Sequence, residues 1–191
     1  TSQEDEHGIG IGLGCNGIID VLFTPLNARD KNNPVHILSS CVGARKPLAY
    51  ITITSSDKKP EMAGNIFAYE NDELFIAGFP FASAGNVVTT EIKRCLQNQS
   101  SASFIFETET DGTVKIFTEI ILPSLHLVIY GSNYDIYPLM EMADILGWQI
   151  TVVANLHKIR RTEISSHVQL VSNRLDMIPQ TDDFTATVLM T

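Results

Sequence analysis

The apolar segments in the last third of the chain follow an order that few folds can accommodate. Leu125–Tyr130 is a continuous apolar run, Gly131 opens a turn, and a second apolar run follows at Ile150–Val153 after an amphipathic segment. Continuous apolar runs of this length are typical of strands buried on both faces. A strand, a helix and a strand with short connections form a right-handed parallel unit. The sequence therefore predicts a Rossmann-like parallel sheet here.

Weaker patterns extend this parallel unit toward residue 191. They predict a helical segment near Leu156–Ser165, a strand at Val168–Val171 and a last strand at Phe184–Met190. Four apolar side chains share the face of the first helix that we expect to pack on the sheet: Leu139, Met142, Ala143 and Leu146. Gly147 stands at the expected C-terminal cap of that helix.

The first 122 residues alternate short apolar runs with turns instead. The strands predicted there are Ile18–Phe23, Leu48–Thr54, a hairpin of Gly64–Tyr69 and Glu73–Ala77 around Asn71-Asp72, and a hairpin of Phe104–Thr108 and Val114–Ile120 with Asp111-Gly112 as the turn. One predicted helix opens at Asn33-Pro34, has Val35, Leu38, Cys41 and Val42 on its inner face, and closes at Gly43 and Pro47. A second starts at Thr89 or Thr90, with Ile92, Cys95 and Leu96 inward. The expected class is α/β: an α+β domain over residues 1–122, then a Rossmann-like domain over 123–191.

Composition excludes several classes of protein. The 191 residues carry 13 Lys+Arg and 22 Asp+Glu, a net charge of −9, which argues against a nucleic-acid partner. No apolar run approaches the roughly 18 residues of a membrane span, and the polar N-terminus is not a signal peptide. Three widely spaced cysteines indicate reduced thiols in a cytoplasmic protein. The five histidines are scattered, so we expect no metal site.

The turn after Leu125–Tyr130 is the first candidate site. A glycine turn between a strand and a helix presents free N–H groups that suit a phosphate. Of the G-x-G-x-x-G fingerprint, Gly131 is present, but Asn133 and Ile136 replace the other glycines. The acidic ribose ligand expected at the end of the second strand is also missing, because Ala154 stands there. These features favour a plain α/β turn over NAD(P) binding, which is the alternative.

Two charged features near this turn have alternative interpretations. Asp135 is either an N-terminal cap of the helix or a site carboxylate, and the cap is favoured. The basic stretch Lys158-Ile-Arg-Arg161 either meets a ligand phosphate or forms an exposed face. No nucleophile elbow, P-loop or Ser/His/Asp set is present, so we assign no catalytic residue.

The second candidate site is a glycine-rich segment, residues 8–17. Its backbone amides could cradle an anionic ligand, with Cys15 as a thiolate or persulfide carrier and Asn16 as a hydrogen-bond donor. The alternative is a buried cysteine in a tight packing turn, which local features favour. Cys41 and Cys95 are expected in the core.

Both candidate sites fall in segments that resemble the XdhC/CoxI family, accessory factors of xanthine dehydrogenase and carbon monoxide dehydrogenase. The segments, in chain order, are Gly12-Leu-Gly-Cys-Asn-Gly-Ile-Ile-Asp-Val-Leu-Phe-Thr-Pro-Leu26, Phe117-Thr-Glu-Ile-Ile-Leu-Pro123, Leu127-Val-Ile-Tyr-Gly-Ser-Asn-Tyr-Asp-Ile-Tyr-Pro-Leu139, Leu146-Gly-Trp-Gln-Ile-Thr-Val-Val153 and Thr187-Val-Leu-Met-Thr191. The chain departs from the family pattern at Thr24, at Ser132-Asn133 and at Ala154. The family's "GGCLE"-like and "GSR"-like motifs are absent, which suggests a piece of a longer protein.

The resemblance implies a cofactor-insertion chaperone rather than a catalyst. Such a factor binds the molybdenum cofactor, supports its sulfuration with a cysteine desulfurase and hands it to a molybdenum hydroxylase apoenzyme. A homo-oligomer is expected. The residues it assigns to cofactor binding are Gly12, Gly14, Cys15, Asn16 and Gly17 in the first loop, and Gly131, Ser132, Asn133 and Asp135 in the second.

Overall fold

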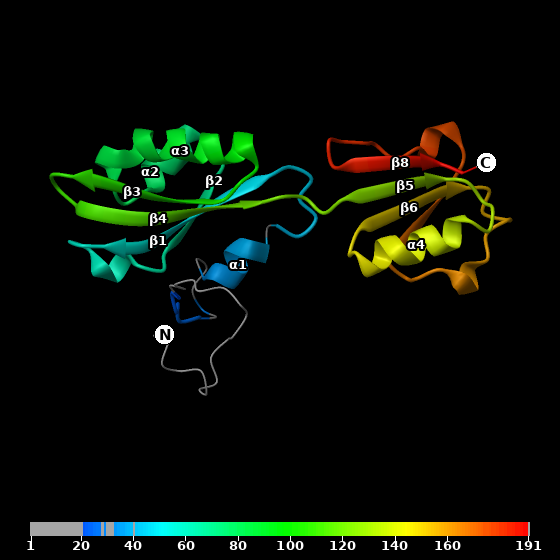
Figure 1. Ribbon diagram of the computed structural model, residues 1–191, viewed down its shortest axis with the longest axis horizontal. Coiled ribbons are helices and arrows are strands. Elements are labelled where there is room, and N and C mark those ends of the chain that lie inside the picture. Colours follow the sequence, from blue (N-terminus) through cyan, green and yellow to red (C-terminus); the bar gives the residue numbers. More distant parts are fainter. Residues whose placement is uncertain (1–20, 28, 30–32, 40, 191) are drawn as a thin grey trace, which may run out of the picture.

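The computed structural model describes residues 21–27, 29, 33–39 and 41–190, and contains two four-stranded sheets. The two sheets lie one after the other along the long axis of the molecule (Figure 1). The first is antiparallel and the second parallel, which confirms the predicted α/β class. Across the described ranges, no helix has the length and apolar character needed to cross a membrane.

The first sheet has the strand order β2-β1-β4-β3, with helices on one face. Its strands are β1 (Leu48–Ser56), β2 (Ile66–Tyr69), β3 (Ala102–Thr108) and β4 (Gly112–Ile121). The helical elements around it are α1 (Pro34–Ser39), η1 (Pro60–Met62), α2 (Asp72–Gly78), η2 (Ala82–Ala84) and α3 (Gly85–Asn98). Helices α2 and α3 lie together over one face of the sheet (Figure 1). The predicted β3–β4 hairpin is confirmed, with Gly112 at φ +67°.

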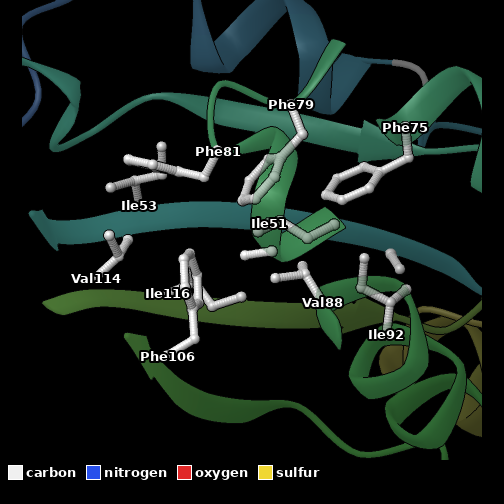
Figure 2. Packing of buried hydrophobic residues seen from close by; sticks show 12 residues of the cluster. Ile51, Ile53, Phe75, Phe79, Phe81, Val88, Ile92, Phe106, Val114 and Ile116 are labelled. Atoms are coloured by element: carbon white, nitrogen blue, oxygen red, sulfur yellow. The ribbon is translucent and has the colours of Figure 1, made fainter. Parts of the chain in front are cut away.

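The core of this part lies between the sheet and helices α2 and α3. Aromatic side chains from α2 and the segment after it meet aliphatic side chains of β1 and β4 (Figure 2). The Phe75 and Phe79 rings stack with centroids 4.8 Å apart, and Phe81 is fully buried. Ile92 is buried and Cys95 is 1% exposed, as predicted for the inner face of α3.

Several predictions for this part are wrong. Residues 73–77 belong to α2 and not to a hairpin strand, because Asn71 Oδ1 accepts a hydrogen bond from Leu74 N at 2.9 Å and caps a helix. Helix α3 begins at Gly85, before Thr89, which is buried within it. Val21–Phe23 lie in no strand, and 18–20 fall outside the described residues.

The predicted inner face of the first helix also differs. Helix α1 ends at Ser39, and Val35 and Val42 are 61% and 87% exposed rather than turned toward a core. Cys41 lies beyond the helix and is half-buried, with its Sγ 3.4 Å from the hydroxyl of Tyr50. The prediction that Cys41 belongs to the core is therefore wrong.

The second sheet has the strand order β7-β6-β5-β8, all parallel. Its strands are β5 (His126–Tyr130), β6 (Gln149–Ala154), β7 (Val168–Ser172) and β8 (Thr185–Leu189). Its helical elements are α4 (Ile136–Ile145), η3 (Arg161–Glu163) and η4 (Leu175–Met177). Gly147, at φ +70°, caps α4 as predicted, with its N–H donating to Asp144 O at 2.9 Å.

Two predictions for the second sheet need correction. Helix α4 packs on the sheet through Ile136, Met140 and Ala143, whereas Met142 and Leu146 are 57% and 62% exposed. The helical structure within the segment 156–165, where a helix was predicted, is limited to the single 3-10 turn η3. The N–H of Arg160 in that segment donates to Tyr137 Oη at 2.9 Å and is not available to a helix.

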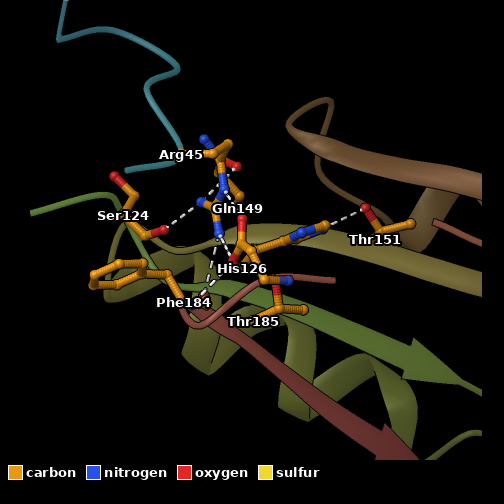
Figure 3. Close-up of polar contacts among 8 residues, drawn as sticks. Arg45, Ser124, His126, Gln149, Thr151, Phe184 and Thr185 are labelled. Carbon is orange, nitrogen blue, oxygen red and sulfur yellow. Dashed lines mark hydrogen bonds and ion pairs between the residues drawn. The ribbon is translucent and has the colours of Figure 1, made fainter. Parts of the chain in front are cut away.

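One arginine joins the two parts of the molecule. Arg45 precedes β1, and its guanidinium forms a bidentate ion pair with Asp182 at 2.8 Å, near the start of β8. It also donates to Ser124 O at 2.6 Å, in the connection between β4 and β5 (Figure 3). Arg45 thus holds the connection between the sheets against the second sheet.

Candidate functional site

A cleft of about 350 Å³ lies at the carboxyl ends of the parallel strands. Three neighbouring strands and the loops after β6 and β7 provide its lining: Tyr130, Gly131, Ser132, Val153, Ala154, Asn155, Lys158, Asn173, Leu189 and Met190. The chain proceeds from β5 to β6 and β7 on one side and returns to β8 on the other. The cleft is therefore at the point where the strand order reverses, the usual ligand position in open parallel sheets.

Gly131 sets the geometry of this cleft. Its N–H donates to Val153 O at 3.2 Å, and Met190 N donates to Tyr130 O at 2.8 Å. A Cβ on Gly131 would lie 2.2 Å from the carbonyl oxygen of Met190. Only glycine therefore lets β8 approach the end of β5 this closely.

The cleft is rich in hydrogen-bond donors and carries one positive charge. Among the described lining residues, Lys158 is the one ionisable side chain apart from the phenol of Tyr130, and its ammonium has no ion pair within the described ranges. Within the described part of the chain, no acceptor bonds the N–H groups of residues 132–135 at the start of α4. Free N–H groups at a helix N-terminus together with a lysine suit an anion such as phosphate.

The second predicted loop is only partly in the cleft. Gly131 and Ser132 line it, whereas Asn133 is exposed and neither Asn133 nor Asp135 is a lining residue. Asp135 stands at the N-cap of α4, but its side chain makes no capping bond. Its Oδ1 is buried without a hydrogen-bond partner. Asp135 is thus the N-cap residue, as the sequence favoured, but its side chain does not form the expected capping bond.

The first predicted loop falls outside the described residues. Gly12, Gly14, Cys15, Asn16 and Gly17 all precede residue 21. Among the described residues, no group of three or more His, Cys, Asp or Glu side chains is placed to hold a metal ion.

From the sequence, Lys158 could contact a ligand phosphate or lie on an exposed face, and Asn155 and Asn173 were not assigned to a site. Asn155 follows β6 directly, and Asn173 follows β7, with its N–H donating to Ala154 O at 3.1 Å. The carboxyl ends of parallel strands meet at one edge of a sheet, so polar residues that follow each strand were the available signal.

Comparisons with known proteins do not assign this chain to a family. No protein-family model matches the chain, and no curated protein matches it. Among solved structures, it is similar to a xanthine dehydrogenase from Bacillus halodurans, with 13% identity and a TM-score of 0.37. That match covers 83% of this chain and 72% of the other.

Proposed function

We propose that this chain is an accessory protein that binds the molybdenum cofactor and delivers it to a molybdenum hydroxylase. The observation that carries the proposal is the cleft at the carboxyl ends of β5, β6 and β8. The cleft offers the Lys158 ammonium and the hydroxyl and N–H groups of Ser132 to an anion, and the pterin of the molybdenum cofactor carries a phosphate. No described lining residues form a nucleophile–base pair, which favours binding over catalysis. The resemblance of the sequence motifs supplies the identity of the cofactor.

The proposed roles follow from this chemistry. The Lys158 ammonium and the hydroxyl and N–H groups of Ser132 hold the phosphate, and Gly131 shapes the turn that presents them. Asp135, at the N-cap of α4, lies next to these groups in the chain. The segment with Gly12, Gly14, Cys15, Asn16 and Gly17 contributes to the pocket for the rest of the cofactor. The cofactor itself supplies the molybdenum centre that the client enzyme uses. A cytoplasmic homo-oligomer that works with a cysteine desulfurase and the apoenzyme completes the proposal.

The second candidate is an NAD(P)-binding module, either an oxidoreductase or a dinucleotide sensor. Its support is the position of the cleft, at the point where the strand order reverses. Three substitutions oppose it. Asn133 and Ile136 replace two glycines of the fingerprint, and Ala154 replaces the ribose-binding acid.

The first experiment measures cofactor that copurifies with the full chain from cells that make it. Pterin extracted from the protein is oxidised to a fluorescent form and quantified. We expect Lys158→Glu to lower the pterin content at least tenfold, while Lys115→Glu, at an exposed position on β4, leaves it unchanged. Equal pterin content in Lys158→Glu and the wild type, or no pterin in the wild type, would overturn the proposal.

A second experiment separates the glycine-rich segment from the cleft. The double variant Cys15→Ala with Gly14→Val is expected to lose affinity for molybdopterin. Unchanged affinity would remove this segment from the site. A parallel titration with NADPH and NADH is expected to show no micromolar binding. Micromolar binding that Lys158→Glu abolishes would favour the second candidate.

A further inference from the structure

A second feature, remote from the cleft, is the free edge of the first sheet. Strand β2 is the outermost strand, and it pairs with β1 alone among the described strands. Its four residues, Ile66–Tyr69, include no lysine and no proline, the residues that commonly protect such edges. An unprotected edge offers unpaired backbone groups to another extended chain.

The pairing with β1 decides which backbone groups face outward. Gly64 N donates to Ile53 O at 2.8 Å, and Ile53 N donates to Asn65 O at 3.0 Å. With Gly64 at φ +91°, this is a glycine β-bulge at the start of β2. The next hydrogen-bonded pair of an antiparallel ladder comes two residues on, which is Ile51 with Phe67.

The alternation places the groups of the intervening residues on the free side. Phe67 and Tyr69 direct their N–H and C=O groups toward β1, so Ile66 and Ala68 direct theirs away from it. In the described part of the chain, no hydrogen bond reaches these outward groups. Two donors and two acceptors therefore stand along this edge at the spacing of an extended peptide.

A groove of about 790 Å³ follows this edge. Residues Asn65–Ala68 line it, together with Leu74, Phe75 and Gly78 of α2. The described lining residues from the segment 24–37 are Thr24, Pro25, Asn27, Asn33, Pro34 and Ile37. An edge strand beside a helix, with apolar side chains between them, is a geometry that accepts an added strand.

The charge in the groove narrows the choice of ligand. Among the described residues that line the groove, Glu61 is the one ionisable side chain, and within the described ranges it makes no ion pair. The whole chain carries a net charge of −9. A partner segment with one lysine or arginine near the Glu61 end is therefore complementary in charge.

We propose that the groove along β2 binds an extended segment of a partner protein, which adds to the sheet as a fifth strand. The segment exchanges backbone hydrogen bonds with Ile66 and Ala68. Its alternate side chains contact Phe67 and Leu74, and a basic residue pairs with Glu61. The proposal is independent of cofactor binding at the other sheet.

The experiment selects ligands for the full chain from a phage-displayed library of random dodecapeptides. We expect enriched peptides to combine alternating apolar residues with one lysine or arginine. Synthetic copies are then methylated at single backbone nitrogens. Methylation at alternate residues is expected to lower affinity at least tenfold, and methylation at the residues between them to have little effect.

Protein variants complete the test. Ala68→Pro removes one outward N–H and no bond to β1, so we expect at least tenfold weaker binding with an unchanged circular dichroism spectrum. Glu61→Lys is expected to weaken the binding of the basic peptides. Glu119→Lys, at an exposed position on β4, should leave their affinity unchanged.

Three results would overturn the proposal. The first is the absence of any enriched peptide. The second is a selected peptide whose affinity does not alternate with the position of the methylated nitrogen and is the same for Glu61→Lys as for the wild type. The third is a dimer of the free chain that Ala68→Pro converts to a monomer, because the edge would then bind a second copy.

Discussion

At the scale of single residues, the cleft depends on one glycine. The Cβ of an alanine at position 131 would lie 2.2 Å from Met190 O, inside the contact distance of any real pair of atoms. We expect Gly131→Ala to lower the free energy of unfolding by about 1–3 kcal/mol, because β5 and β8 must separate. Urea denaturation measures this, with Gly78→Ala as the control. That position has no atom within 4 Å of a new Cβ, so its variant should be at least as stable as the wild type.

His126 is a second residue whose environment makes a measurable prediction. Burial lowers its pKa below the usual 6.5, and the positive charge of Arg45 lowers it further, against a smaller opposite effect of Asp182. Its Nε2 lies 2.8 Å from Thr151 Oγ1 on β6. The folded state therefore holds the imidazole neutral where the unfolded chain would protonate it.

The sign of the pH dependence follows from that lowered pKa. The unfolded chain binds more protons as pH falls through 6.5, so the wild type loses stability over that range and levels off below the folded pKa. In His126→Gln, which retains a group able to bond Thr151, this loss should be absent. Thermal melting between about pH 7.5 and 5 measures it, and parallel curves for the two proteins would contradict the prediction.

At the scale of elements, α2 depends on its cap. Asn71 Oδ1 accepts from Leu74 N at 2.9 Å, and Asp72 and Glu73 occupy the first turn, where negative charge is favourable. We expect Asn71→Ala to cost about 1 kcal/mol of unfolding free energy. Asn98→Ala, at the exposed end of α3, should change stability by less than about 0.5 kcal/mol in urea denaturation. Equal costs for the two would show that the cap bond does not stabilise α2.

The same cap explains what could be predicted from the sequence. The apolar runs of β1, β5 and β6 were predicted correctly, because continuous apolar segments bounded by glycine and proline have few alternatives. In α2, the run Leu74–Ala77 fits a strand or a helix equally well by composition, and Asn71-Asp72 is typical of both a turn and a cap. The cap bond and the packing of Phe75 in the core decide between them, and neither is visible in the sequence.

The choice of the buried face of α4 and the set of residues that line the cleft were also not fully predictable from local sequence. Apolar residues occur on two overlapping stripes of α4, and the stripe with Met140 is buried while the stripe with Met142 is exposed. In the cleft, Gly131 and Ser132 were predicted from a local turn pattern. Asn173 enters from a loop over 40 residues away along the chain, through the order of the strands. Local patterns predict elements, whereas the sheet order assembles the cleft.

At the scale of the whole molecule, Arg45 and Asp182 couple the two sheets. Asp182 accepts from the Arg45 guanidinium, from Thr185 Oγ1 at 2.8 Å and from Phe184 N at 2.9 Å. The hydrogen bonds from Arg45 are the largest cause that holds the pKa of Asp182 well below its usual 3.8. Because the chain connecting β4 to β5 is also bound by Arg45 at Ser124 O, loss of this ion pair should free the sheets to unfold separately.

We therefore expect thermal unfolding of Arg45→Gln and of Asp182→Asn to show two separate transitions. If the wild type already shows two transitions, the variants should show them further apart in temperature. Arg94→Gln is the matched control, because Arg94 pairs with Glu91 within α3 and spans no boundary. A carboxyl with a lowered folded pKa stabilises above its unfolded pKa, and that contribution disappears as pH falls through the folded value. The wild type should thus resemble Asp182→Asn increasingly as pH falls below 3.8. Identical melting of Arg45→Gln and Arg94→Gln at neutral pH would show that the sheets are coupled by other contacts.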